Sequence, residues 1–249
     1  MSRRLSQHAV LLLAGGLFAV AALSAGAQTT FSGPGVANGS GVNDGAGISS
    51  LTISNDANSI TFTLNSSQPQ ASYIFYAIEL QIVGQAANGS TSLVNPWGEN
   101  IGISSGVNAL VNTWGTGASA LTYNAGWTQN ESESYSAGGT GSTFFTVTFA
   151  LSSLGLSVGE QFKVDAVSSY ASPGGQSAYG ALDTSGWPAE SDNSYQPWLG
   201  SNFYDSATDP NSTFNTAGNV YTVVPEPTTV VLVGLGGFLL ACRRFLRRA

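Results

Sequence analysis

The sequence predicts an all-β protein: a single jelly-roll-like β-sandwich, flanked by an N-terminal signal peptide and one short C-terminal transmembrane helix. Two observations predict the sandwich. Apolar and polar residues alternate over short runs, and segments rich in Gly, Asn and Ser separate these runs, which is the pattern of strands joined by turns. In addition, no long stretch between the two ends of the 249-residue chain keeps a helical period with capping residues.

The N-terminus has the three parts of a secretory signal peptide. Arg3 and Arg4 give a positive start, residues 9–23 form an apolar run, and Ala25-Gly26-Ala27 is a small-residue cleavage site. We therefore expect residues 1–27 to be removed on export.

Strand patterns begin after a segment dense in Gly, Asn and Ser. This segment, residues 28–48, is expected to be a flexible lead-in, and the β-sandwich ectodomain is expected over residues 49–223. A single helical turn is expected at residues 151–156, before the strand that follows Gly159. Eight to ten short strands of this kind are typical of a jelly-roll sandwich. The clearest alternating runs are residues 51–53, 60–64, 73–83, 121–123, 145–151, 162–166 and 220–224.

The C-terminus has the features of a short membrane span. Pro225-Glu226-Pro227 precedes an uncharged apolar run at residues 228–242, and four arginines follow it. A helix of this length reaches only about 22 Å, less than the roughly 30 Å of the hydrocarbon core, so the span is minimal. The arginines are expected to stop transfer and to stay in the cytoplasm, with everything before Pro225 outside. These membrane-stop residues are Arg243, Arg244, Arg247 and Arg248.

Together with the signal peptide, the C-terminal segment at residues 224–249 resembles the PEP-CTERM sorting signal of Gram-negative bacteria. Pro225, Glu226 and Pro227 match its motif, and the two prolines keep the site extended. The resemblance implies recognition by an exosortase, a membrane transpeptidase that cleaves near the motif. The precursor would then lie transiently in the inner membrane, and the product at the cell surface or in the extracellular matrix.

Composition excludes several classes of function for the ectodomain. Lys163 is its only basic residue and accompanies 13 acidic ones, so its net charge is near −12. No cluster of Lys or Arg is present to release phosphate counterions, so nucleic acid is not an expected partner. The only His and Cys, His8 and Cys242, lie in the terminal segments. The ectodomain therefore lacks the residues of a Ser-His-Asp or Cys-His nucleophile and of a zinc site.

Aromatic residues outside the alternating runs suggest a glycan contact. Trp187 and Trp198, with Tyr195 between them, border an acidic loop. Flat ring faces can stack on the C–H face of a saccharide while nearby amides and carboxylates bond its hydroxyl groups. In the alternative interpretation, the loop aromatics fold back and cap the ends of the sandwich.

No cofactor is expected, although the composition admits a structural calcium site. Four acidic residues, Asp183, Asp192, Asp205 and Asp209, can supply the oxygen ligands that calcium prefers. No recognisable calcium loop is present, so solvated turn residues are the alternative. A calcium-dependent melting temperature would distinguish the two.

A second resemblance concerns the ectodomain. Residues 145–155, 159–165 and 181–183 resemble the second half of carbohydrate-binding and DOMON-like sandwiches. The resemblance supports a sandwich fold and contains no ligand motif.

Three functions remain open after these exclusions. The first, which we favour, is a non-enzymatic structural or interaction protein embedded in exopolysaccharide or biofilm. The second is a carbohydrate-binding module that uses its loop Trp and Tyr residues. The third is a glycosidase, which requires two carboxylates about 5 to 10 Å apart.

Overall fold

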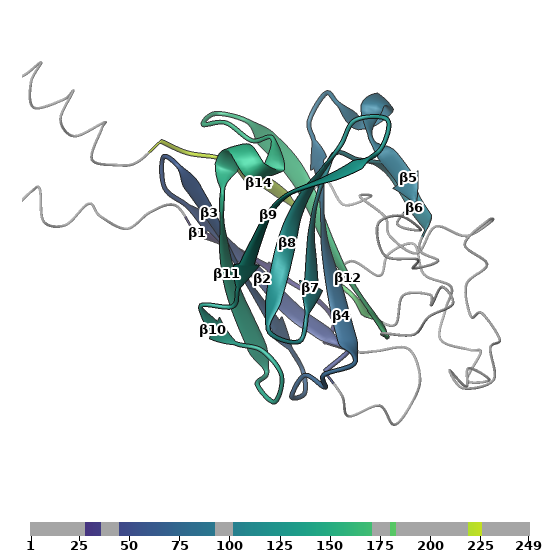
Figure 1. The fold of residues 1–249 in the computed structure, drawn as a ribbon, viewed down its shortest axis with the longest axis vertical. Coiled ribbons are helices and arrows are strands. Elements are labelled where there is room, and N and C mark those ends of the chain that lie inside the picture. The colour runs from purple at the N-terminus through teal and green to yellow at the C-terminus, as the bar shows by residue number, and fades with distance from the viewer. Residues whose placement is uncertain (1–27, 36–44, 93–101, 171–179, 183–218, 226–249) are drawn as a thin grey trace, which may run out of the picture.

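The computed structural model describes residues 28–35, 45–92, 102–170, 180–182 and 219–225, and they form two packed β-sheets (Figure 1). The predicted all-β sandwich is confirmed. Within the described ranges, no helix is long and apolar enough to cross a membrane. The predicted span at residues 228–242 lies outside these ranges.

The first sheet has five antiparallel strands in the order β1-β2-β3-β11-β10. Hydroxyl pairs run across its outer face: Thr61 and Thr148 lie with their Oγ1 atoms 2.8 Å apart, and those of Thr63 and Thr146 are 3.0 Å apart. Such cross-strand pairs stabilise a sheet by about 0.2–1 kcal/mol each. The strands are β1 (Gln28–Ser32), β2 (Ile48–Asn55), β3 (Ser59–Ser66), β10 (Ala137–Gly138) and β11 (Phe144–Ala150).

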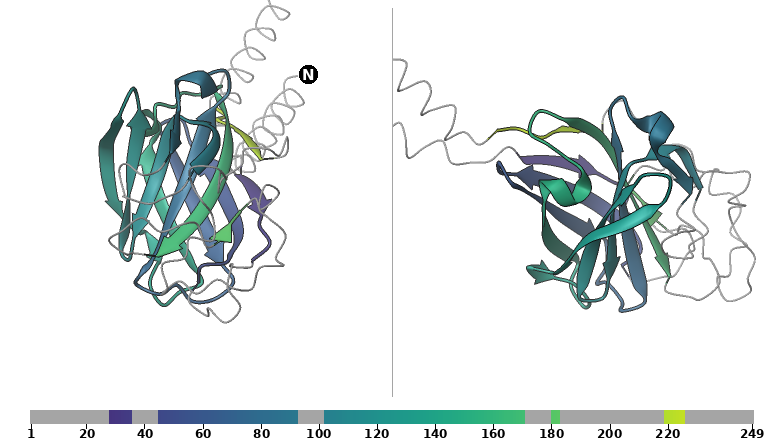
Figure 2. Two further views of the ribbon diagram at one scale, coloured as in Figure 1. Left: turned by 90° about the vertical axis from the view of Figure 1, so that its right-hand side faces the viewer. Right: turned by 45° about the horizontal axis from the view of Figure 1, so that its top comes forward.

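The second sheet follows the order β13-β12-β4-β7-β8-β9, and β14 also pairs with β12. Strands β4, β7 and β8 follow one another as neighbours, and β12 returns to lie beside β4, which is a Greek key. The strands are β4 (Ile74–Ile82), β7 (Ala109–Trp114), β8 (Gly117–Tyr123), β9 (Trp127–Ser134), β12 (Gln161–Tyr170), β13 (Gly180–Ala181) and β14 (Val220–Thr222). Figure 2 shows the two sheets face to face.

Three smaller elements complete the described fold. A separate ribbon of β5 (Ser90–Ser92) and β6 (Gly102–Val107) lies at the end of β4, next to the 3₁₀ turn η1 (Ala86–Asn88). The predicted helical turn is confirmed as the 3₁₀ turn η2 (Leu151–Leu154). Gly155 ends η2 in the left-handed region, at φ 66°, where glycine carries no Cβ penalty.

The core lies between the two sheets and is filled by alternating apolar side chains. On β3 and β11, Phe62, Phe145 and Phe149 are completely or almost completely buried, and on β12 Phe162 is buried opposite them. Burying such a side chain contributes about 1.5–3 kcal/mol. The sandwich is therefore held mainly by the period-two pattern visible in the sequence.

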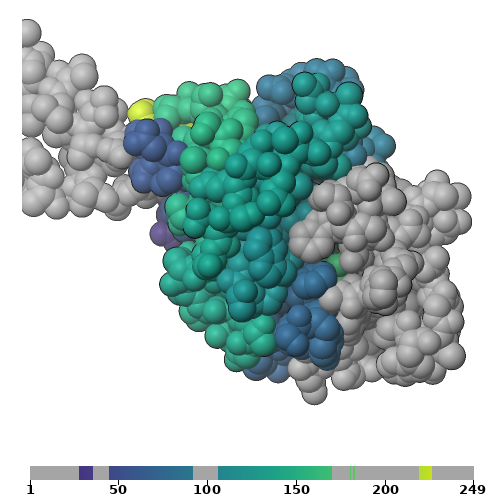
Figure 3. All heavy atoms as spheres, viewed as in Figure 1, coloured from purple at the N-terminus to yellow at the C-terminus, as the bar shows by residue number. Residues whose placement is uncertain are grey.

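The outer face of the second sheet is also buried along its middle strands. Leu110 and Asn112 point away from the core and are 0% and 1% exposed. At the edge of the sheet, β9 is exposed along most of its length and contributes to the teal surface in Figure 3. Burial therefore decreases across the second sheet, from β7, which is buried on both faces, to β9, which forms a solvent-facing edge.

The expected lead-in at residues 28–48 is partly wrong. Gln28–Ser32 is strand β1, which pairs with β2 from Gln28 opposite Ser54 to Ser32 opposite Ser50. Its Phe31 is buried in the core. A short run with one apolar residue gives too weak a periodicity to be recognised, and it forms a strand because β2 offers a free edge.

Both ends of the sandwich meet at the end of β2. Gln28 is paired with Ser54, and the side chain of Asn55 binds Val224 after β14. The expected signal peptide and sorting signal therefore join the sandwich at one corner.

Candidate functional site

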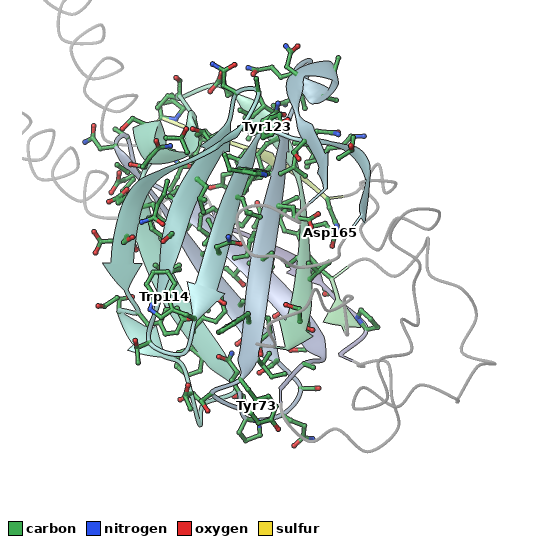
Figure 4. The ribbon with its side chains drawn as sticks, turned by 45° about the vertical axis from the view of Figure 1, so that its right-hand side comes forward. Tyr73, Trp114, Tyr123 and Asp165 are labelled. Carbon is green, nitrogen blue, oxygen red and sulfur yellow. The ribbon has the colours of Figure 1, made fainter. Side chains whose placement is uncertain are left out.

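A pocket of about 810 Å³ opens at the end of the sandwich where β4 and β8 finish. Four segments that are distant in sequence line it: the end of β4 with the η1 turn, Asn108 before β7, the β8–β9 loop with adjoining residues of both strands, and η2. The Greek key brings these segments together, since all of them lie at one end of the strands. Figure 4 shows Tyr123 at this end of the sheet, with Tyr73 at the opposite end.

Side-chain amides dominate the lining. They belong to Gln85, Asn88, Asn108, Asn124 and Asn130. Thr122 and Tyr123 add hydroxyl groups, and none of the described lining residues carries a charge. Amides both donate and accept hydrogen bonds, so this wall suits a neutral polar ligand.

Two of the amides are fixed by the fold. Asn108 accepts from the Ile82 N–H at 2.9 Å through Oδ1 and donates to the Gln85 carbonyl at 3.0 Å through Nδ2. Asn130 donates through Nδ2 to Thr122 Oγ1 and to the Ser153 carbonyl, both at 2.9 Å. These bonds tie the η1 turn and η2 to the sheet, so the walls of the pocket are held in place.

The aromatic pair beside the pocket is also ordered. Tyr123 ends β8 and Trp127 begins β9; their ring centroids are 5.2 Å apart with an interplanar angle of 63°, an edge-on arrangement. This geometry is favourable for aromatic rings. Both side chains are half-buried, so part of each ring faces solvent.

The loop between these two residues carries backbone strain. Ala125 has φ 55°, the only positive φ of a residue other than glycine in the described chain. A left-handed conformation costs such a residue roughly 1–2 kcal/mol. Strain of this kind is often found at functional sites.

Close backbone contact shapes the opposite wall. A Cβ added to Gly106 of β6 would lie 2.0 Å from the Ala86 carbonyl oxygen, and one on Gly89 would lie 2.4 Å from the Gly106 carbonyl carbon. Only glycine fits at these two positions, and this allows η1 to lie directly on β6.

The strand register brings two acidic residues together elsewhere in the second sheet. Glu79 of β4 lies directly opposite Asp165 of β12, and neither is exposed. Lys163, the ectodomain's one basic residue, lies two positions from Asp165 on the same face of β12. Opposed residues of this kind have Cβ atoms about 4.5–5.5 Å apart, which is near the spacing that the glycosidase hypothesis requires. Both carboxylates are buried away from solvent.

Tyr135 and Trp114, two further aromatic residues outside the alternating runs of the sequence, lie in different places. Tyr135 stacks on Phe145 with ring centroids 4.8 Å apart, and so caps the core, as the capping interpretation requires. Trp114 ends β7 and is 37% exposed, at the end of the sheet away from Tyr123 (Figure 4). The predicted glycan contacts Trp187, Tyr195 and Trp198 lie outside the described residues.

The predicted calcium ligands Asp183, Asp192, Asp205 and Asp209 also lie outside the described residues. In the parts of the chain that the structure does describe, no group of three or more His, Cys, Asp or Glu side chains is placed to hold a metal ion. Sequence reasoning did not identify the pocket amides, and the only local signal for them is the recurrence of Asn in turn segments.

The start of the sorting segment is firmly attached to the sandwich. Val223 is buried and exchanges backbone hydrogen bonds with the turn before β12: its N–H donates to the Glu160 carbonyl at 2.9 Å, and its carbonyl accepts from Gly159 at 2.7 Å. Pro225, two residues later, is exposed. The described contacts with the sandwich thus reach the residue immediately before the Pro-Glu-Pro motif, and the four membrane-stop arginines lie outside the described residues.

Fold and C-terminus together define an all-β sandwich that carries a sorting segment directly at its end. Residues 223–248 match the family model of the PEP-CTERM protein-sorting motif, so the chain carries this signal. The motif implies recognition by an exosortase, export, and sorting to the cell surface or the extracellular space. Comparison with curated proteins and with solved structures found no match.

Proposed function

We propose that this protein is a non-enzymatic component of the extracellular matrix, sorted by an exosortase and embedded in exopolysaccharide. The observation that carries the proposal is the PEP-CTERM motif at residues 223–248, joined without a linker to a folded β-sandwich. In this proposal the precursor is held in the inner membrane by the apolar run at residues 228–242, until cleavage near the motif releases it.

The charge of the ectodomain and the burial of two of its carboxylates support a matrix role. The ectodomain has one basic residue and 13 acidic ones, and in a neutral polysaccharide gel such a domain stays soluble and avoids nonspecific binding to anionic surfaces. Glu79 and Asp165 lie opposite each other on neighbouring strands, and both carboxylates are buried. This arrangement supports a structural or binding role over hydrolysis.

The sorting step is tested by replacing Pro225, Glu226 and Pro227 with alanine in a host that has an exosortase. We expect the variant to remain at full length in the inner-membrane fraction, while the wild-type chain is shortened and leaves that fraction. Pro69→Ala, an exposed proline in a loop of the sandwich, is the matched control and should sort normally. Normal release of the triple variant would refute the proposed sorting.

The matrix role has its own readout. After export, the protein should sediment with the extracellular polysaccharide and dissolve when that polysaccharide is digested enzymatically. A protein that remains entirely free in the culture medium would contradict a matrix function, even if its sorting is normal.

A further inference from the structure

We propose that the amide-lined pocket at the Tyr123 end of the sandwich binds a neutral saccharide segment of the extracellular polysaccharide. The proposal rests on the proposed matrix function and names the ligand class and the residues that contact it. These residues differ from the loop aromatics at 187–198 that the sequence suggested.

The absence of charge around the pocket selects the ligand class. All described lining side chains are neutral, and five of them are amides. An anionic ligand would meet no positive group there, in an ectodomain with a net charge near −12. A metal ion would meet no carboxylate among the described lining residues. A ligand with many neutral hydroxyl groups matches donors and acceptors that occur together on each amide.

Three of the amides are available for such a ligand. The side chains of Gln85, Asn88 and Asn124 are exposed and make no hydrogen bond to the described parts of the chain. Asn108 and Asn130, in contrast, are already bonded to the surrounding loops. The fold therefore uses two amides to hold the walls and leaves three facing the pocket.

An apolar surface is present beside these polar groups. Tyr123 lines the pocket, and its ring is held edge-on by Trp127 at 5.2 Å. A ring fixed in this way loses little entropy when the C–H face of a sugar stacks on it. Small-molecule sites combine such an apolar face with a few convergent polar groups.

The size of the pocket agrees with this ligand class. Its volume of about 810 Å³ lies within the roughly 300–1,000 Å³ of small-molecule sites. The pocket is open to solvent on one side, because Gln85, Asn88 and Asn124 are all exposed. An open pocket can hold part of a long chain that continues past it on both sides.

The proposal is tested by affinity electrophoresis and calorimetry with the full chain in a zwitterionic detergent, because sugar-based detergents would compete. The probes are three neutral polysaccharides, dextran, laminarin and galactomannan, and acidic alginate. We expect at least one neutral polymer to bind and alginate not to bind. Tyr123→Ala, and separately the double change Asn88→Ala with Asn124→Ala, should weaken that binding about tenfold.

Matched controls lie at the other end of the sandwich. Tyr73→Ala removes an exposed tyrosine, and Gln68→Ala removes an exposed amide near it; both should bind as the wild type does. Circular dichroism should show the same melting temperature, within a few degrees, for the two-asparagine variant and the wild type.

Three results would overturn the proposal: no binding of any neutral polymer, equal binding of alginate, or pocket variants that bind as tightly as the controls do. Unchanged binding by pocket variants of a protein that still sediments with the matrix would refute this site and leave the proposed function intact. A sorting failure, conversely, would refute the proposed function without affecting the binding result.

Discussion

Asn55 of β2 binds Val224 through both atoms of its amide: Nδ2 donates to the Val224 carbonyl at 2.8 Å, and Oδ1 accepts from the Val224 N–H at 3.2 Å. The same side chain accepts from the Tyr221 hydroxyl at 2.7 Å and donates to the Asp56 carbonyl at 2.6 Å. One buried amide thus fastens the last described segment across 169 residues of sequence. It sets the position at which the chain leaves the sandwich and enters the sorting motif.

Replacing Asn55 by alanine should destabilise the exported protein by about 2–3 kcal/mol, because it removes the hydrogen bonds that Asn55 makes with the buried Tyr221 hydroxyl and with the Val224 backbone. Urea unfolding measures the loss, and hydrogen exchange should show faster exchange at residues 220–224. Asn58→Ala is the control, since its exposed side chain makes no hydrogen bond within the described chain. Equal losses for the two variants would contradict the importance of the Asn55 contacts.

Alkaline pH should destabilise the fold through two tyrosines. Burial raises the pKa of Tyr221 and of Tyr135 from 10.0 to about 12, although a hydrogen bond from Thr113 partly offsets the effect at Tyr135. Well below pH 10 both tyrosines are neutral in the folded and in the unfolded chain, so the stabilisation is complete. Between pH 10 and 12 the unfolded chain ionises first, so the free energy of unfolding falls, by up to about 2 kcal/mol per tyrosine.

Urea unfolding at pH 8, 9, 10 and 11 measures this slope. The double variant Tyr135→Phe with Tyr221→Phe starts lower at pH 8, because it loses the bond to Asn55, but should show a flatter decline above pH 10. Tyr73→Phe, which changes an exposed tyrosine, should keep the wild-type slope. A parallel decline in all three proteins would mean that other groups cause the alkaline loss.

Strands with one buried face could be predicted from the sequence. On β3 the side chains Ile60, Phe62 and Leu64 are buried and those between them are not, so the period-two pattern matches the burial. The same holds for β11. In both strands, hydrophobic burial alone decides which face turns inward.

The alternating pattern of the sequence did not indicate strands β7 and β9, for opposite reasons. β7 is buried on both faces at its first five positions, so Leu110 and Asn112 break the alternation. β9 is mostly exposed, and its sequence WTQNESES has no apolar residue after Trp127. It is held as an edge strand by backbone pairing with β8, and such pairing leaves little trace in the sequence.

The pocket could not be predicted because its lining comes from loops about 70 residues apart that only the Greek key brings together. Asn88 and Asn124 resemble ordinary turn residues in the sequence, where Asn is common for local reasons. The sorting motif is the opposite case. Its parts are consecutive, so the sequence alone was enough to identify it.

The close contact between Gly106 and the η1 turn predicts a second way to damage the pocket. In Gly106→Ala the new methyl group would overlap the Ala86 carbonyl, so η1 must move away from β6. We expect a loss of about 1–3 kcal/mol in urea unfolding, typical of overpacking, together with weaker saccharide binding. Gly126→Ala is the matched control at the same end of the sandwich, because a Cβ there meets no atom within 4 Å. If both variants behave like the wild type, η1 does not depend on this contact.

The strained residue in the β8–β9 loop gives a change that should stabilise the protein. Ala125 has φ 55°, a conformation that glycine adopts without the Cβ clash. Ala125→Gly should therefore raise the free energy of unfolding by about 0.5–1 kcal/mol, the relieved strain being reduced by the greater entropy of glycine in the unfolded chain. Ala87→Gly is the control, since this exposed alanine of η1 has no positive φ and should be destabilised instead. Melting curves of the two variants should shift in opposite directions. A lower melting temperature for Ala125→Gly would show that the loop gains more from a restricted backbone than it loses to strain.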